Sequence, residues 1–235
     1  MDERAYQQLL SQLEYKGSDL VFLNDEDSCR QHNILLACEK GIISYLQDLK
    51  IDTPEFFSHK NYRSIKEGDS YVWFYQAQGM EILLTRRKEG KKLKTTRGSA
   101  AGMSYGRGKG NNSDFYHRCH LLGEQIFPNR ATYLKGEYIV GTAYLNIDAK
   151  VSMLTYENKI VNILKKQESK IFYKVTPIFK DGEVIARGVR MTARSFNDEW
   201  KETEECRFDV YLFNRSPGYR IDYKTGSITE CKEKI

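Results

Sequence analysis

Apolar residues recur at helical spacing in the first fifty residues of the chain. One run predicts an amphipathic helix over residues 3–15, with an apolar face formed by Tyr6, Leu9, Leu10 and Leu13. A second, longer helix is predicted from the capping residues at 25–28 to about Leu49. Pro54 and the polar stretch up to Gly68 end this section. Residues 1–65 are therefore predicted to form a helical amino-terminal extension.

From residue 66 onward the pattern changes to that of strands. Residues 70–75 and 80–85 are rich in aromatic and β-branched side chains and flank Gln76-Ala77-Gln78-Gly79, which predicts a β-hairpin. A further amphipathic helix is predicted over residues 153–167. Antiparallel strands are predicted over residues 169–179, 184–193, 205–214 and 218–222, with turns at 181–182 and 222–226. The pattern indicates an α+β domain over residues 66–235, built on a central antiparallel sheet.

Composition adds a few limits to this picture. The net charge of +5 suits a nucleic-acid partner, but many unrelated proteins share it. Five cysteines, odd in number and widely spaced, favour a reducing compartment and have no zinc-ligand spacing. No apolar run approaches the ~20 residues of a membrane span, and Met1-Asp2-Glu3-Arg4 does not resemble a signal peptide. We therefore expect no membrane partner and a cytoplasmic location; secretion after removal of a signal is the alternative.

A short predicted strand at residues 116–121 carries the candidate catalytic histidine. Alternation along a strand places Arg118 and His120 on one face and His117 and Cys119 on the other. A histidine with its ordinary pKa near ~6.5 can take a proton from water at neutral pH. His120 beside Arg118 is thus a candidate base next to a candidate phosphate contact. The alternatives are a structural histidine and an arginine paired with a buried carboxylate.

Two residues further along the chain provide oxygen atoms. The amide oxygen of Asn146 is a hard donor of the kind that Mg²⁺ accepts, and Mg²⁺ keeps several of its waters. Glu157, on the first turns of the helix at 153–167, is placed to hold such a water. Asn146 as a helix cap and Glu157 as an ordinary first-turn carboxylate are the alternatives.

Basic residues gather ahead of the histidine strand and just behind it. Arg87 and Arg97, in the basic run from 86 to 97, and Arg130 are candidate contacts to substrate phosphates; a solvated loop is the alternative. The glycine-rich segment at 98–113 has no GK[ST] sequence after it, which argues against a nucleotide cradle and favours a flap that grips DNA.

Three ordered motifs resemble the DNA/RNA non-specific endonuclease family with the ββα-metal core, in its branch of DNA-entry nucleases and bacterial or phage-encoded secreted DNases. They are Arg118-Cys119-His120-Leu121-Leu122-Gly123, Gly141-Thr142 with Asn146, and Met153-Leu154-Thr155-Tyr156-Glu157-Asn158, within a similarity over residues 97–230. The resemblance implies His120 as the general base, Asn146 as the metal ligand and Glu157 as a carboxylate near the metal waters. It also implies Mg²⁺ as the cofactor, with Mn²⁺ as a substitute.

Two positions depart from the family pattern. His117 stands where the family prefers Asp or Asn, and Glu137, which we expect to be exposed, stands where many members have Asn. The sequence as a whole predicts a Mg²⁺-dependent, sequence-non-specific endonuclease acting on DNA and RNA. The alternative is a family member that binds nucleic acid but has lost catalysis. A third interpretation gives residues 1–65 a docking role for an inhibitor or immunity protein.

Overall fold

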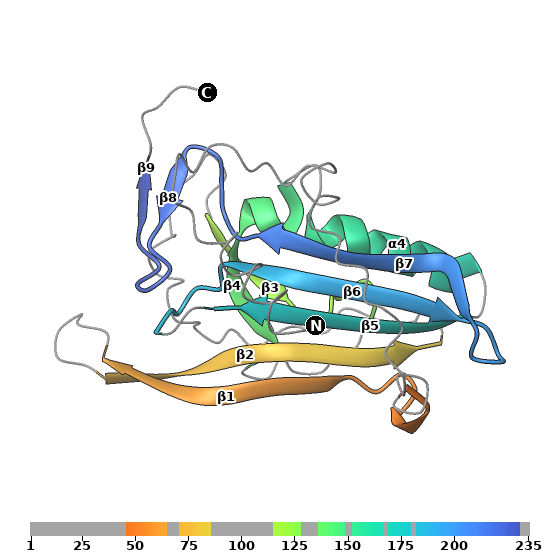
Figure 1. The fold of residues 1–235 in the computed structure, drawn as a ribbon. Helices are drawn as coiled ribbons and strands as arrows, with labels where there is room; N and C mark the ends of the chain where they lie inside the picture. Colours follow the sequence, from red (N-terminus) through yellow and green to blue (C-terminus); the bar gives the residue numbers. More distant parts are fainter. Residues whose placement is uncertain are drawn as a thin grey trace, which may run out of the picture.

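A five-stranded antiparallel sheet forms the body of the protein (Figure 1). The computed structural model describes residues 46–64, 71–85, 115–127, 136–148, 152–166, 169–179 and 182–230. The strand order is β1 (Glu55–Ser64), β2 (Tyr71–Leu84), β5 (Lys170–Ile178), β6 (Gly188–Phe196), β7 (Glu202–Phe213). Two small antiparallel pairs lie beside it: β3 (Tyr116–His120) with β4 (Tyr138–Thr142), and β8 (Tyr219–Ile221) with β9 (Ile228–Glu230).

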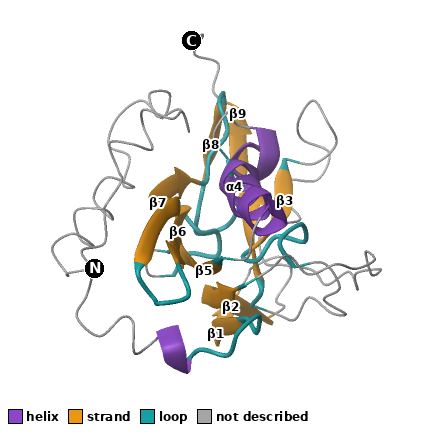
Figure 2. Cartoon of the chain, turned by 90° about the vertical axis from the view of Figure 1, so that its right-hand side faces the viewer, coloured by secondary structure: helices purple, strands orange, loops and turns teal. Residues whose placement is uncertain are grey.

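The long helix α4 (Met153–Lys166) packs on one face of this sheet, next to β3 (Figure 2). Its apolar stripe joins every second residue of the central strands in one core that includes Tyr156, Ile160, Ile171, Tyr173, Val175, Val189, Met191 and Ala193. The intervening residues point to the opposite face, because side chains alternate along a strand. On that face Phe172 and Phe196 form a smaller apolar cluster with Leu46 and Leu83.

The predicted hairpin at residues 70–85 is wrong, because Tyr71–Leu84 form the single strand β2. The chain runs straight through 76–79, where Gln76 and Ala77 are buried. Gly79 pairs with Phe57 next to a register shift at which Gln78 of β2 has no partner in β1, and a β-carbon at Gly79 would lie 3.1 Å from the carbonyl oxygen of Val175. Glycine therefore allows a bulge and a close approach between strands here, rather than a reversal of the chain.

The predicted helical extension is also wrong at residues 55–64, which form the edge strand β1. Hydrogen bonding to β2 along its whole length compensates for the weak hydrophobic pattern of this segment. Residues 46–48 are helical, but the rest of the helices predicted before residue 49 lies outside the described residues. The domain division at residue 65 stays a prediction. Within the described ranges, no helix has the length and apolar character needed to cross a membrane.

The helix and strands predicted from residue 153 onward are confirmed with small shifts, whereas the predicted turn at 181–182 lies partly outside the described residues. Helix α4 and strands β5, β7 and β8 cover the predicted segments, while β6 begins at Gly188, four residues later than predicted. Before β6, the backbone N–H groups of Val184 and Ile185 both donate to the carbonyl oxygen of Tyr223 at 3.0 Å, so these residues pair with the turn after β8. The turn at 222–226 joins β8 to β9 and does not close the main sheet.

Candidate active site

Strand β3 presents Arg118 and His120 on the same side as Tyr138. His120 pairs with Tyr138 of β4 across the strands, and their rings meet edge to face at 6.4 Å between centroids. The guanidinium carbon of Arg118 lies 5.9 Å from the centre of the same tyrosine ring. Both Arg118 and His120 are half-buried, so each has packed surroundings and part of its surface open to solvent. This face therefore holds a candidate base and a candidate phosphate contact side by side.

Asn146 lies on a π-helical turn, η2 (Tyr144–Asp148), that follows β4 directly. Its Nδ2 lies 3.2 Å from Nδ1 of His117, which is the residue three positions before His120. Both side chains are half-buried. The contact joins the predicted metal ligand to β3 through His117, which strand alternation places on the face opposite Arg118 and His120.

A buried network fixes the backbone of η2. Leu145 N donates to Thr142 Oγ1 at 2.9 Å, and Thr142 Oγ1 donates to the carbonyl oxygen of Arg215 at 2.6 Å. Thr142 N donates to Asn214 Oδ1 at 2.8 Å, and Asn214 Nδ2 donates to the carbonyls of Val140 and Ala186 at 3.1 and 2.8 Å. The position of Asn146 is thus set from the end of β7. Sequence reasoning missed Asn214, whose role depends on contacts more than 70 residues away.

Glu157 lies on α4 with its carboxylate against the residues that follow β3. A β-carbon at Gly123 would overlap that carboxylate, so the glycine allows the backbone shortly after β3 to lie directly against the Glu157 side chain. Gln125 Nε2 donates to Glu157 Oε2 at 3.3 Å. Burial raises the pKa of the Glu157 carboxyl to about 8, although the hydrogen bond from Gln125 acts in the opposite direction. The pKa of the neighbouring Cys119 thiol is also raised, first by burial and then by the charge of Glu157.

The raised pKa of Glu157 predicts a pH-dependent stability for the metal-free protein. An unfolded glutamate titrates near ~4.3, whereas the folded one titrates at about 8. Between these values the folded state keeps a proton that the unfolded chain has lost, so the free energy of unfolding falls as pH rises, by at most about 1.4 kcal/mol per pH unit. Glu157→Gln should remove this slope in urea unfolding at pH 5 to 8 in EDTA. An unchanged slope in this variant, matching that of the exposed control Glu204→Gln, would contradict the assignment.

The donor set around β3 fits a hard cation that keeps most of its waters. The described part of the chain contains no cluster of three or more His, Cys, Asp or Glu residues suited to holding a metal. Mg²⁺ needs only one or two protein oxygens, and with Nδ2 of Asn146 turned toward His117, the amide oxygen is left for another partner. Asn146 therefore suits Mg²⁺ or Mn²⁺ better than a metal that requires several nitrogen or sulfur ligands.

Some predicted site residues lie outside the described residues. They are Arg87, Arg97 and Arg130, together with the rest of the basic run and the glycine-rich segment. Glu137 was expected to be exposed, but it is 3 % exposed. Its carbonyl oxygen accepts from Leu121 N at 3.0 Å, because residue 137 lies just before β4, beside the end of β3.

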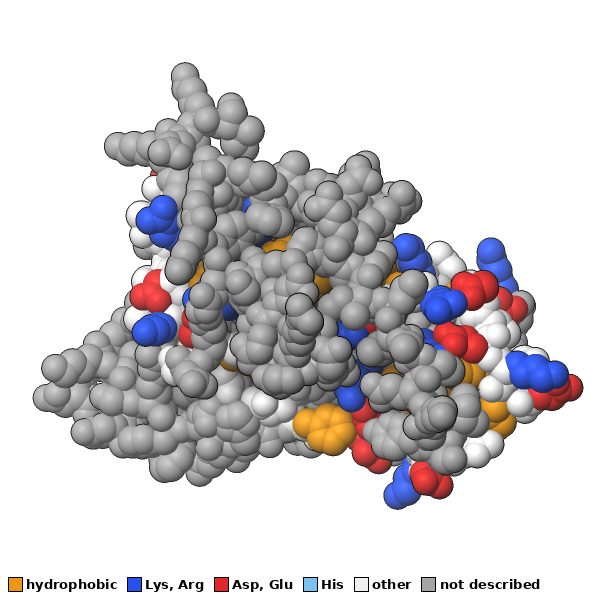
Figure 3. All heavy atoms as spheres, in the orientation of Figure 1, with side chains coloured by type: hydrophobic (Ala, Val, Ile, Leu, Met, Phe, Trp, Pro, Cys, Tyr) orange, Lys and Arg blue, Asp and Glu red, His pale blue; other side chains and the backbone are white. Residues whose placement is uncertain are grey.

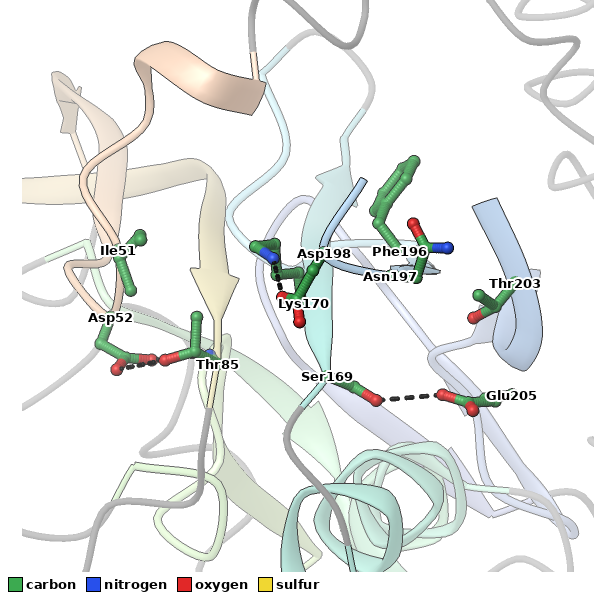
Figure 4. A pocket seen from close by; sticks show the side chains of 10 residues that line it. All are labelled: Ile51, Asp52, Thr85, Ser169, Lys170, Phe196, Asn197, Asp198, Thr203 and Glu205. Carbon is green, nitrogen blue, oxygen red and sulfur yellow. Dashed lines mark hydrogen bonds and ion pairs between the residues drawn. The ribbon is translucent and has the colours of Figure 1, made fainter. Parts of the chain in front are cut away.

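A pocket of about 550 Å³ opens elsewhere, between β2, β5 and the β6–β7 connection (Figure 4). Its carboxylates are engaged within the protein: Asp52 accepts from Thr85, Asp198 from Lys170, and Glu205 from Ser169. No residue of β3, β4, η2 or α4 lines it. In the view of Figure 3, the visible acidic and basic side chains of the described residues lie interspersed.

A sequence model described as DNA/RNA non-specific endonuclease matches residues 80–197, which is half of the chain. The chain belongs to the DNA/RNA non-specific endonuclease family. The predicted family is therefore confirmed, and the match contains β3, β4, η2 and α4, with His120, Asn146 and Glu157 among their residues. The enzymes of this family are hydrolases.

Individual relatives of this endonuclease-family chain are distant. A deoxyribonuclease from Streptococcus dysgalactiae subsp. equisimilis is 26% identical over 140 residues, which are 59% of this chain but only 40% of the relative. The match thus spans less than half of that protein's length.

Three solved structures share the fold of this endonuclease-family chain. NucA from Streptococcus agalactiae with magnesium bound is 18% identical, with a TM-score of 0.54 over 78% of this chain and 82% of that one. A protein described as an extracellular endonuclease is 21% identical, with a TM-score of 0.52 over 80% and 92%. Sda1 nuclease with bound zinc is 17% identical, with a TM-score of 0.52 over 78% and 93%.

Proposed function

We propose that this protein is a sequence-non-specific endonuclease that hydrolyses phosphodiester bonds of DNA, and of RNA as well, with a divalent cation bound at a ββα-metal site. The observation that carries the proposal is the match of residues 80–197 to the non-specific endonuclease family, because that span contains the candidate base His120 and the candidate ligand Asn146. The preferred cation is Mg²⁺, with Mn²⁺ as a substitute, and the relative bound to magnesium supports this choice.

Each residue has a separate role in the proposed reaction. His120, half-buried beside Tyr138, takes the proton from the attacking water. Arg118, on the same face, faces a phosphate oxygen of the nucleic acid. Asn146 would hold the cation through its amide oxygen, with Glu157 close to the waters of that cation. A divalent cation, when bound, neutralises charge on the phosphate and on the leaving oxygen.

The remaining proposals concern partners and location. Arg87, Arg97 and Arg130 stay candidate phosphate contacts, and an inhibitor or immunity protein docking on residues 1–65 stays a hypothesis. The relative described as extracellular supports secretion over the cytoplasmic location predicted first.

The test is nicking of supercoiled plasmid in Mg²⁺ and in EDTA. We expect nicking in Mg²⁺, none in EDTA, and recovery when Mg²⁺ is restored. Asn146→Ala should lower the rate by ~10²-fold or more, the scale of losing one group that stabilises transition-state charge. Asn162→Ala, at an exposed position on α4, is the matched control and should nick at the normal rate. Plasmid that is bound but never nicked in Mg²⁺ would instead favour the non-catalytic binding protein.

A further inference from the structure

The contact between His117 and Asn146 restricts which atoms each side chain can present. The amide nitrogen carries only hydrogens to donate, so Nδ1 of His117 must accept across the 3.2 Å between them. In the reverse orientation, the NH₂ group of the amide would face the cation. An amide NH₂ group does not act as a metal ligand. Only the orientation with Nδ2 toward His117 is consistent with a metal-binding Asn146.

The contacts around η2 fix the backbone at Asn146 but not the orientation of its side-chain amide. The backbone of η2 is held through Leu145 and Thr142, and Thr142 is anchored to Asn214. Side-chain rotation of Asn146 is not restricted by those bonds. Fixing a rotatable side chain costs conformational entropy, and a hydrogen bond formed before the cation arrives removes that cost from binding.

We propose that His117 is a positioning residue that holds the Asn146 amide with its oxygen toward the cation. The inference rests on the proposed function. It also gives a physical meaning to the departure at position 117, because an imidazole nitrogen can accept an N–H, as a carboxylate or amide oxygen can.

Mn²⁺ binding without nucleic acid, followed by calorimetry, tests this role separately from catalysis. His117→Phe keeps a ring of similar size without an acceptor and should weaken Mn²⁺ binding by 10- to 100-fold, the usual loss when a partner of a metal ligand is removed. His117→Asn restores an uncharged acceptor and should recover affinity to within a few-fold of the wild type. His117→Asp adds a negative charge and should bind at least as tightly as His117→Asn. Thermal melting of each variant verifies the fold.

Two outcomes separate the inference from the function on which it rests. If Asn146→Ala abolishes Mn²⁺ binding while His117→Phe binds as the wild type does, the positioning role is wrong and the metal site stands. If Asn146→Ala binds Mn²⁺ as the wild type does, the proposed metal site itself is wrong. Weak binding by His117→Phe that His117→Asn does not restore would also contradict the inference, because an acceptor alone would then be insufficient.

Discussion

Replacing His120 with alanine is expected to slow plasmid nicking by ~10²–10⁴-fold, the range for loss of a general base. The imidazole of His120 is half-buried at the end of β3. Tyr138, whose ring it contacts, is also half-buried. We therefore expect the variant to fold and to melt within a few degrees of the wild type. Initial nicking rates in Mg²⁺, measured with enough enzyme to detect the slowest variant, give the ratio.

The matched control is His59→Ala, which removes a histidine from the edge strand β1. It should nick at the wild-type rate. A His120→Ala variant that retains more than a tenth of the wild-type rate would remove His120 from the role of base and leave the family fold without an assigned proton acceptor.

Removing the carboxylate of Asp209 is expected to cause the largest loss of stability. Arg190 donates from Nε to Asp209 Oδ1 at 2.6 Å and pairs with Oδ2 through its Nη2, and Thr192 donates to the same carboxylate at 3.1 Å. Arg190 and Asp209 are only 8 % and 5 % exposed, so Asp209→Ala leaves a charged guanidinium buried without its partner. Such a change costs about 3–5 kcal/mol, which corresponds to a fall in Tm of roughly 10 °C for a chain of this length.

The control for this prediction is Glu204→Ala, which removes an exposed carboxylate from β7. Arg207 pairs with Glu204 at 2.7 Å, but the Glu204 side chain is 80% exposed, and exposed pairs contribute about 0–1 kcal/mol. In urea and thermal unfolding, Asp209→Ala should therefore lose much more stability than Glu204→Ala. Equal shifts in Tm would show that burial of the Arg190–Asp209 pair does not determine its contribution.

The sequence predicted those elements in which the core-facing side chains recur at regular spacing along the chain. Helix α4 was recognised because its apolar residues repeat every three or four positions, and β5 because β-branched and aromatic residues fill it. Strand β1 was not recognised, since an edge strand depends on hydrogen bonds to its neighbour more than on hydrophobic residues. Gly79 was interpreted as a turn residue because a bulge inside a long strand needs the same residue type.

For the candidate site, the sequence predicted residue types but not all their contacts. The motif around His120 and its order relative to Asn146 and Glu157 were sufficient to identify the family. The contact of His117 with Asn146 spans 29 positions and forms only when η2 folds back against β3. The burial of Glu157 likewise depends on Gly123 approaching α4 closely, which a single sequence does not show.

The hairpin formed by β8 and β9 lies beyond residue 197, where the family match ends, yet it is tied to the site. Tyr223, between these strands, donates from its hydroxyl to the carbonyl oxygen of Asn214 at 2.8 Å, and Asn214 fixes the backbone before η2. A fragment cut at residue 197 would keep His120, Asn146 and Glu157 but lose this brace. The part of the fold that supports the candidate site therefore extends further at its carboxyl end than the stretch that the family model matches.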